Sequence, residues 1–205
     1  MTDVAYGVDA AVRYPAGVTP FKLDIMGHPT EVKPRAGDFY LTHQIDRPPF
    51  PPAFWAIRLG QRLRYRGEWR AYAYWNHAGV FVDDQGMVVE ALNSGVVQRN
   101  ISAYKPEEYT IVYMAMSDDD RQQVRECALD HVGSRYGWLS IVNIFFRLFG
   151  GKLSYSIQGS KICSALVATC LQAAGYTFRG FDPNRIMPAD LAWLANVHPR
   201  EVERA

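Results

Sequence analysis

The chain has 205 residues, of which 48% are hydrophobic and 13% aromatic, so it can bury a sizeable core in one domain. It carries 22 Lys and Arg residues against 21 Asp and Glu residues. This balance excludes the strong overall field that attracts nucleic acid or an anionic membrane surface. We therefore expect no nucleic-acid partner.

The first residues of the chain and the positions of its cysteines predict the cellular compartment. Residues 1–15 (MTDVAYGVDAAVRYP) show no basic segment followed by an apolar one, so no Sec-type signal is visible. The longest apolar run, 138–150, contains polar residues and is too short to span a bilayer, so no transmembrane segment is expected. Cys163 and Cys170 lie on one predicted helix, about 10 Å apart along its axis, too far for a disulfide. These features predict a cytoplasmic protein with reduced thiols.

The predicted elements follow from apolar periodicity and from residues that begin or end helices. Residues 1–35 hold several prolines and are predicted to be irregular. Strands are predicted at 39–42, 76–82, 87–92 and 108–116, the middle two joined as a hairpin by the turn sequence DDQG. Helices are predicted at 53–66, from 117 to about 132, from near 160 to 175, and at 188–195. This order differs from a regular βαβα alternation and favours an α+β fold with an antiparallel sheet.

The three cysteines occupy different kinds of position. Cysteine catalysis needs a thiolate, a base that forms it, and a group that orients the base. Cys163 lies in the first turn of its predicted helix, where the dipole and unpaired N–H groups favour a thiolate. Cys170 lies two turns further on the apolar stripe, and Cys127 lies among apolar positions of the 117–132 helix, so both are interpreted as core residues. Cys163 is therefore the candidate nucleophile.

His77 and Glu90 are the candidate base and orienting group. His77 begins a strand and is followed by small residues that leave space beside it. Glu90 interrupts the apolar run of the partner strand. A hairpin turn of two or four residues makes His77 and Glu90 diagonal neighbours on one face of the sheet. A three-residue turn would put them on opposite faces.

Each candidate also has an ordinary structural interpretation. A cysteine at a helix start is more often structural than catalytic, a histidine in a strand is usually a satisfied core residue, and a glutamate in a strand usually faces solvent. The combination of Cys163, His77 and Glu90 is more specific, because all three occupy geometrically suitable positions. No Cys/His spacing typical of zinc is visible.

Six short motifs resemble those of one enzyme family. They are PRAGDFYL, WNHAGVF, VVEALNSGV, SRYGW, ICSALV and MPADLAW, and together they span about residues 35 to 195. In this order they resemble the circularly permuted NlpC/P60 (papain-like) cysteine hydrolases, the YiiX/YebB-like proteins, and more distantly the lecithin:retinol acyltransferase group. Ordinary NlpC/P60 domains have the Cys helix before the His strand, whereas the order here is His, Glu, Cys.

The resemblance implies a site and a reaction. Cys163 would be the nucleophile, His77 the general base and Glu90 the residue that orients His77, with the Cys163 N–H in an oxyanion hole. The expected enzyme is a thiol hydrolase or acyltransferase without metal or cofactor, acting on cell-wall peptide amides or on acyl-lipid amides and esters. The expected division is an N-terminal arm (1–34), a permuted NlpC/P60-like catalytic domain (35–197) and a C-terminal tail (198–205).

Four points stay open. Ala165 stands where relatives often have Glu, which indicates either a surface change or an altered site. The apolar segment 138–159 is either a lid over the cleft or extra core packing. Without a signal, access to a cell wall would require delivery by a phage or a secretion system. The alternative function is a catalytically silent papain-like binding module in a virion or toxin assembly.

Overall fold

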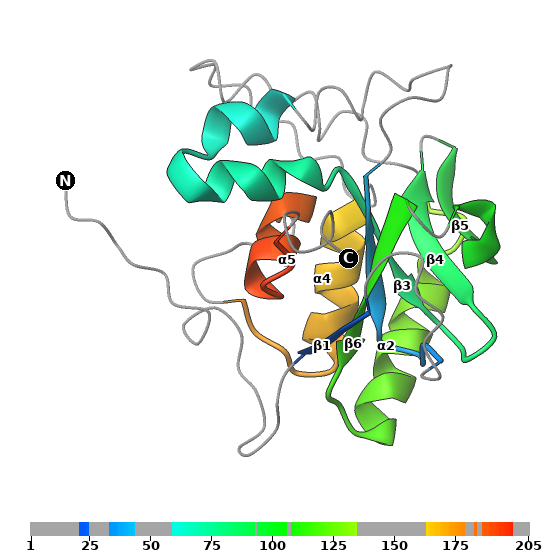
Figure 1. Cartoon of the computed structure of the whole chain (residues 1–205). Helices are drawn as coiled ribbons and strands as arrows, with labels where there is room; N and C mark the ends of the chain where they lie inside the picture. The colour runs from blue at the N-terminus through cyan, green and yellow to red at the C-terminus, as the bar shows by residue number, and fades with distance from the viewer. Residues whose placement is uncertain are drawn as a thin grey trace, which may run out of the picture.

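The computed structural model describes residues 21–24, 33–43, 59–92, 94–105, 108–134, 163–178, 183 and 186–198. Its centre is a six-stranded sheet in the order β1-β6-β2-β3-β4-β5 (Figure 1). The strands are β1 (Phe21–Asp24), β2 (Phe39–Thr42), β3 (His77–Phe81), β4 (Met87–Leu92), β5 (Gly95–Asn100) and β6 (Tyr109–Met114). All neighbouring strands pair antiparallel. The predicted α+β class with an antiparallel sheet is confirmed.

The helices include α2 (Asp118–Asp130), α4 (Cys163–Ala173) and α5 (Pro188–Leu194), with short 3₁₀ helices η2 (Gly67–Tyr74) and η3 (Ile101–Ala103). The helices α2 and α5 begin at their predicted positions. The hydroxyl of Ser117 accepts from the N–H of Asp120, and the carboxylate of Asp120 accepts from the N–H of Ser117. This capping box satisfies two of the otherwise unpaired groups at the start of α2. At α5, the carboxylate of Asp190 accepts from the N–H of Met187 at 2.8 Å.

Several elements differ from the prediction. The strand β1 lies within residues 1–35, which the sequence predicts to be irregular. A strand of four residues among prolines is too short to show the alternation of apolar and polar residues that identifies a strand. β5 was not predicted, since its sequence GVVQRN has apolar residues only in its first half. Residues 59–64 of the predicted 53–66 helix are helical, and 53–58 lie outside the described residues. The helical residues end at position 64, close to the predicted end of this helix, and after two non-helical residues η2 begins at Gly67, whose φ is 60°.

The two faces of the sheet have different neighbours. The face toward α2, α4 and α5 carries alternate apolar side chains, namely Phe39, Leu41, Ala78, Val80, Val89, Ala91, Val112 and Met114. Figure 1 shows α4 between α5 and the sheet. The opposite face carries Tyr40, Phe81, Val88, Ile111 and Tyr113, which pack with Tyr104. The period of two along each strand therefore separates an apolar helix-covered face from a face rich in tyrosine.

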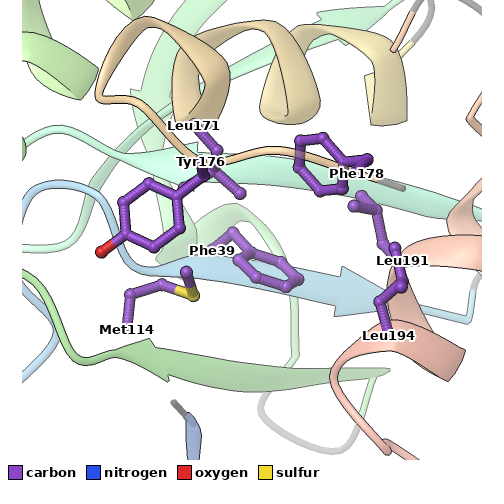
Figure 2. Close-up of a pocket in the computed structure, with 7 residues that line it drawn as sticks. All are labelled: Phe39, Met114, Leu171, Tyr176, Phe178, Leu191 and Leu194. Carbon is purple, nitrogen blue, oxygen red and sulfur yellow. The ribbon is translucent and has the colours of Figure 1, made fainter. Parts of the chain in front are cut away.

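A small gap remains inside the apolar core. It is lined by Phe39, Met114, Leu171, Tyr176, Phe178, Leu191 and Leu194 (Figure 2) and has a volume of about 10 Å³. That volume is at the lower limit for a single water molecule, and an apolar lining offers water no hydrogen bonds. The gap is therefore a packing defect between the sheet and the helices α4 and α5, and not a ligand site.

A buried ion pair joins the start of β2 to α2. The guanidinium of Arg121 donates to Asp38 at 3.0 Å and to the carbonyls of Ala36 at 2.7 Å and Met114 at 2.5 Å. Asp38 also accepts from the N–H groups of Arg35 and Met114, both at 2.8 Å. The exposed fractions of the Arg121 and Asp38 side chains are 11% and 1%. These contacts fix one end of β2 and β6 against α2.

Candidate functional site

The β3–β4 hairpin has the predicted register. Val80 pairs with Val89 and Phe81 with Val88, and the N–H of Val82 donates to the carbonyl of Met87 at 2.9 Å. The connecting turn therefore has four residues, 83–86. An even turn places His77 and Glu90 on the same face, as the sequence predicted.

His77 and Glu90 form a direct contact. Nε2 of His77 lies 2.5 Å from Oε2 of Glu90, and both side chains have an exposed fraction of 0%. Since a carboxylate oxygen only accepts, Nε2 carries the proton and donates it. The imidazole is thus held in one orientation, with Nδ1 directed away from Glu90.

The carboxylate of Glu90 has three further partners. It accepts from the hydroxyl of Tyr40 at 2.5 Å, from the hydroxyl of Tyr104 at 2.6 Å, and from Nε of Arg99. Burial raises the pKa of Glu90, but the hydrogen bond and charge of His77, followed by the two tyrosines, lower it to about 2. Glu90 is therefore ionised at neutral pH although it is buried.

Arg99 closes this group on its more exposed side. Its side chain has an exposed fraction of 34%, and its guanidinium lies 4.6 Å from the ring centroid of Tyr104. It comes from β5, where it pairs with Val88 across the strands. A diagonal position beside Glu90 lets a long side chain reach the carboxylate. We name Tyr40, Tyr104 and Arg99 the carboxylate shell.

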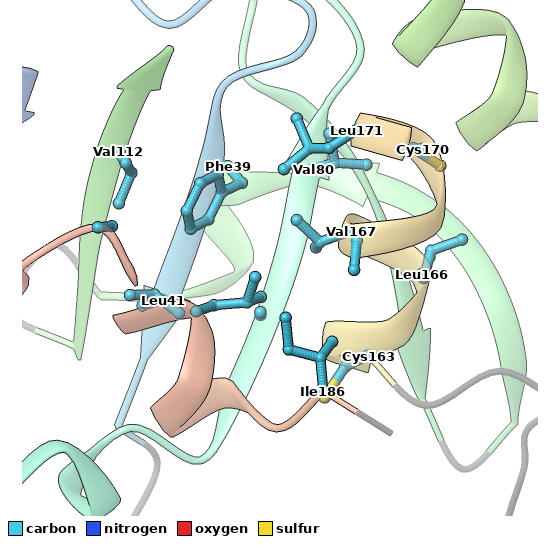
Figure 3. Close-up of a cluster of buried hydrophobic side chains, with 14 of the residues drawn as sticks. Phe39, Leu41, Val80, Val112, Cys163, Leu166, Val167, Cys170, Leu171 and Ile186 are labelled. Carbon is cyan, nitrogen blue, oxygen red and sulfur yellow. The ribbon is translucent and has the colours of Figure 1, made fainter. Parts of the chain in front are cut away.

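Cys163 is the first described residue of α4, and the predicted helix start near Ser160 lies outside the described residues. Its exposed fraction is 0% and it belongs to the main apolar cluster. Figure 3 shows Cys163 in the first turn of α4 and Cys170 near the far end of the same helix. The hydroxyl of the next residue, Ser164, donates to the carbonyl of Ile186 at 2.6 Å and joins this turn to the segment before α5. Cys170 is buried in the core, as predicted.

Cys163 and Glu90 act on His77 from two sides. Burial alone lowers the pKa of His77, but the charge of Cys163 and its hydrogen bond, followed by those of Glu90, raise the pKa to about 9. Because Nε2 is engaged by Glu90, we infer that Nδ1 is the nitrogen that interacts with Cys163. His77 begins β3 and Cys163 begins α4, so the ends of these two elements meet. The structure thus brings all three predicted residues together.

The other described histidines have different surroundings. His43 stacks on Tyr74 with ring centroids 3.5 Å apart, and its Nδ1 donates to the carbonyl of that residue at 2.6 Å. His198 contacts the ring of Tyr72. His131 is the C-cap residue of α2. None of these three belongs to the group around Glu90, and His28 lies outside the described residues.

Two further expectations can be compared with the structure. Ala165 has an exposed fraction of 2%, so the interpretation of this position as a surface change is wrong. The segment 138–159 lies outside the described residues. In the part of the chain that the structure describes, no helix is both long and apolar enough to cross a membrane.

The carboxylate shell was missed by sequence reasoning. Tyr40 lies in the predicted strand 39–42, but its position opposite Gly79 depends on the pairing of β2 with β3. Arg99 lies on the unpredicted strand β5, and Tyr104 follows η3. The only available signal was Gly79 itself, whose missing side chain indicates close approach of another group.

Comparison with known proteins gives no family assignment. No protein-family model matches the chain. No curated protein matches it in sequence.

Proposed function

We propose that this protein is a cysteine hydrolase that cleaves an amide or ester through Cys163, His77 and Glu90. The observation that carries the proposal is the position of His77 between a sulfur and an ionised carboxylate. The chain order of His strand, Glu strand and Cys helix agrees with a circularly permuted NlpC/P60 (papain-like) fold. The antiparallel sheet and the position of Cys163 on a helix packed against it also support the proposal.

The first half of the proposed reaction forms an acyl-enzyme. With a pKa of about 9, His77 is protonated at neutral pH, so we propose a resting imidazolium–thiolate pair. The thiolate of Cys163 attacks the substrate carbonyl carbon, and the oxyanion accepts a hydrogen bond from the Cys163 N–H at the start of α4. The C–N or C–O bond then breaks, and His77 gives its proton to the leaving group.

The second half releases the acid. Neutral His77 takes a proton from water, and the hydroxide attacks the thioester carbon. The C–S bond breaks, the carboxylic acid leaves, and the imidazolium–thiolate pair is restored. Through both halves Glu90 holds Nε2, so that Nδ1 stays directed toward Cys163. The carboxylate shell keeps Glu90 ionised and in place, which makes Tyr40, Tyr104 and Arg99 positioning residues.

Substrate access requires movement of the chain. Cys163 and His77 both have an exposed fraction of 0%, so the arrangement is a closed one. The two substrate classes implied by the family resemblance are cell-wall peptide amides and acyl-lipid amides or esters. Both classes place a carbonyl next to a nitrogen or oxygen leaving group, which is the chemistry that this site supplies.

One observation favours a second candidate function. A completely buried Cys163, His77 and Glu90 would also suit a catalytically silent binding module, in which the ionised group only specifies the fold. The two candidates differ in whether Cys163 ever carries an acyl group. They can therefore be distinguished by following the sulfur directly as well as by following the substrate.

The test combines substrate turnover with mass spectrometry. The protein is incubated with muropeptides, with an acyl-lipid panel and with an activated ester, in buffer containing EDTA. We expect one natural class to be cleaved, with an acyl adduct on Cys163, and loss of both in Cys163→Ala and His77→Gln. Arg125→Ala, which changes an exposed side chain of α2 outside the site, should retain full turnover. Absence of cleavage and of any adduct on Cys163 would contradict the hydrolase and favour the binding module.

A further inference from the structure

A second group of metal-binding side chains lies between α2 and α4. We propose that Cys127, His131 and Cys170 form a binding site for a thiophilic divalent metal ion of the zinc type. The candidate ligand atoms of the three residues all lie within 4.8 Å of one another. Two residues come from α2 and one from α4, so an ion bound there would join the two helices. This inference does not depend on the proposed hydrolase activity.

The spacing of the ligand atoms suits one tetrahedral ion. Cys127 and His131 are four residues apart at the end of α2 and therefore share one side of it. With bonds of about 2.3 Å to sulfur and about 2.1 Å to nitrogen, a tetrahedral zinc ion holds its ligand atoms about 3.5–3.8 Å apart. The candidate ligand atoms of the three residues lie within 4.8 Å of one another. The three groups thus need to close by at most about 1 Å, which side-chain rotation provides.

The imidazole of His131 is already oriented. Its Nδ1 lies 2.7 Å from the carbonyl oxygen of Cys127, and because a carbonyl only accepts, Nδ1 carries the proton. Nε2 is then the ring nitrogen with a free electron pair. A hydrogen bond from the second ring nitrogen to a backbone carbonyl is the usual support of a histidine that binds a metal.

The donor set and its burial define the kind of ion. Two thiolates and one neutral imidazole are soft and borderline donors, which select zinc over magnesium or calcium. Two thiolate charges neutralise the charge of a divalent ion, which suits the complete burial of Cys170. Cys127 and His131 are partly exposed, so the fourth coordination position is open to water from the α2 side.

The site has a consequence for α4. Cys170 lies seven residues after Cys163 on this helix, about 10 Å along its axis. An ion held by Cys170 and by α2 would therefore fix the helix whose first residue is Cys163. In the part of the chain that the structure describes, none of the three cysteines forms a disulfide, so the sulfur atoms of Cys127 and Cys170 are chemically able to bind a metal ion.

Cobalt and zinc binding to the full-length reduced chain test the proposal. We expect one Co²⁺ per chain with the visible bands of tetrahedral cobalt and a sulfur-to-cobalt charge-transfer band, and displacement of Co²⁺ by Zn²⁺. Cys127→Ser and His131→Gln should each weaken binding at least tenfold. The matched control, Cys163→Ser, should retain the full spectrum and affinity.

Thermal unfolding provides the second measurement. Excess Zn²⁺ should raise the Tm of the wild-type chain and of Cys163→Ser, because a ligand that binds only the folded state stabilises it. The same Zn²⁺ concentration should leave the Tm of Cys127→Ser and His131→Gln nearly unchanged. A chain without the cobalt bands overturns the proposal, as does a spectrum that is lost in Cys163→Ser and kept in Cys127→Ser. Both substituted α2 residues are partly exposed, so their variants are expected to fold.

Discussion

The ring of Tyr40 lies against the backbone of Gly79, its partner across the β2–β3 pair. A Cβ atom at position 79 would lie 2.5 Å from Cε1 of Tyr40 and 2.7 Å from its hydroxyl oxygen, far inside contact distance. Because position 79 has no side chain, the hydroxyl of Tyr40 passes over it and reaches Glu90 at 2.5 Å. A glycine on one strand thus places a hydrogen-bond donor from a second strand on a carboxylate of a third.

Gly79→Ala should therefore displace Tyr40 and loosen Glu90. We expect a loss of about 1–3 kcal/mol in the free energy of unfolding, since a buried aromatic ring must move to admit a methyl group. Tyr40→Phe, which removes only the hydroxyl, should cost about 1–3 kcal/mol, because it takes a donor from a charged acceptor. Urea denaturation of the two single variants and the double variant measures the coupling. Additive losses would contradict the contact, because residues that share one interaction are not additive.

The pKa of His77 predicts a pH dependence with a definite sign. Its folded pKa of about 9 lies above the ordinary value of 6.5, so its contribution to stability is fully present below about pH 6.5 and is lost as the pH rises through 9. Glu90 has a folded pKa of about 2 against an ordinary 4.5. Its contribution is present above about pH 4.5 and is lost as the pH falls through 2. Both contributions are complete between pH 4.5 and 6.5.

Denaturation of wild type and His77→Gln at several pH values tests this sign. The difference in unfolding free energy between them should be largest near pH 5.5 and should shrink above pH 9. An NMR titration gives the pKa directly, because the histidine signal that disappears in His77→Gln is that of His77. In Cys163→Ala this signal should titrate at a lower pH, since the charge of Cys163 no longer raises the pKa. An unchanged pKa in Cys163→Ala would show that Cys163 does not raise the pKa of His77.

Local patterns were sufficient to predict the centre of the site. The period of two in β3 and β4, together with an even turn, placed His77 beside Glu90. The apolar helical period placed Cys163 and Cys170 on one helix, α4. These features depend on residues close in sequence or on a hairpin, whose partner strand is fixed by chain order.

Contacts between distant segments could not be predicted in the same way. Arg99 reaches Glu90 from β5, whose polar second half hides the strand pattern. β1 pairs with β6 through backbone groups, which carry no sequence signal. Cys127 and His131 show a helical spacing of four, but their proximity to Cys170 requires knowing that α2 packs on α4. The residues of the carboxylate shell and of the proposed metal site are therefore brought together by packing between elements, which the sequence pattern does not reveal.

Thiol reactivity should distinguish Cys163 from the other cysteines by its rate of alkylation at pH 6 and by the dependence of that rate on reagent size. The imidazolium of His77 stabilises a thiolate next to it, so iodoacetamide should still alkylate Cys163 at pH 6 faster than it alkylates Cys127. Complete burial should make the reaction depend on reagent size, with a bulky maleimide much slower than iodoacetamide. Peptide mass mapping after short exposures gives both rates. In His77→Gln the advantage at pH 6 should disappear, and an advantage that persists would show that His77 does not activate the sulfur.

The buried ion pair of Arg121 and Asp38 is expected to affect the stability of the protein. Arg121→Ala removes a hydrogen-bonded guanidinium and leaves the Asp38 carboxylate buried with two backbone N–H partners. Losing one member of a buried ion pair costs about 3–5 kcal/mol, so a large fall in Tm is expected.

Arg125, one turn further along α2 and exposed, is the matched control, and Arg125→Ala should change stability by about 0.5 kcal/mol or less. The double variant Arg121→Ala with Asp38→Asn should recover part of the loss, because no unpaired charge then remains in the core. Equal effects of Arg121→Ala and Arg125→Ala in urea denaturation would mean that this pair does not hold β2 and β6 to α2.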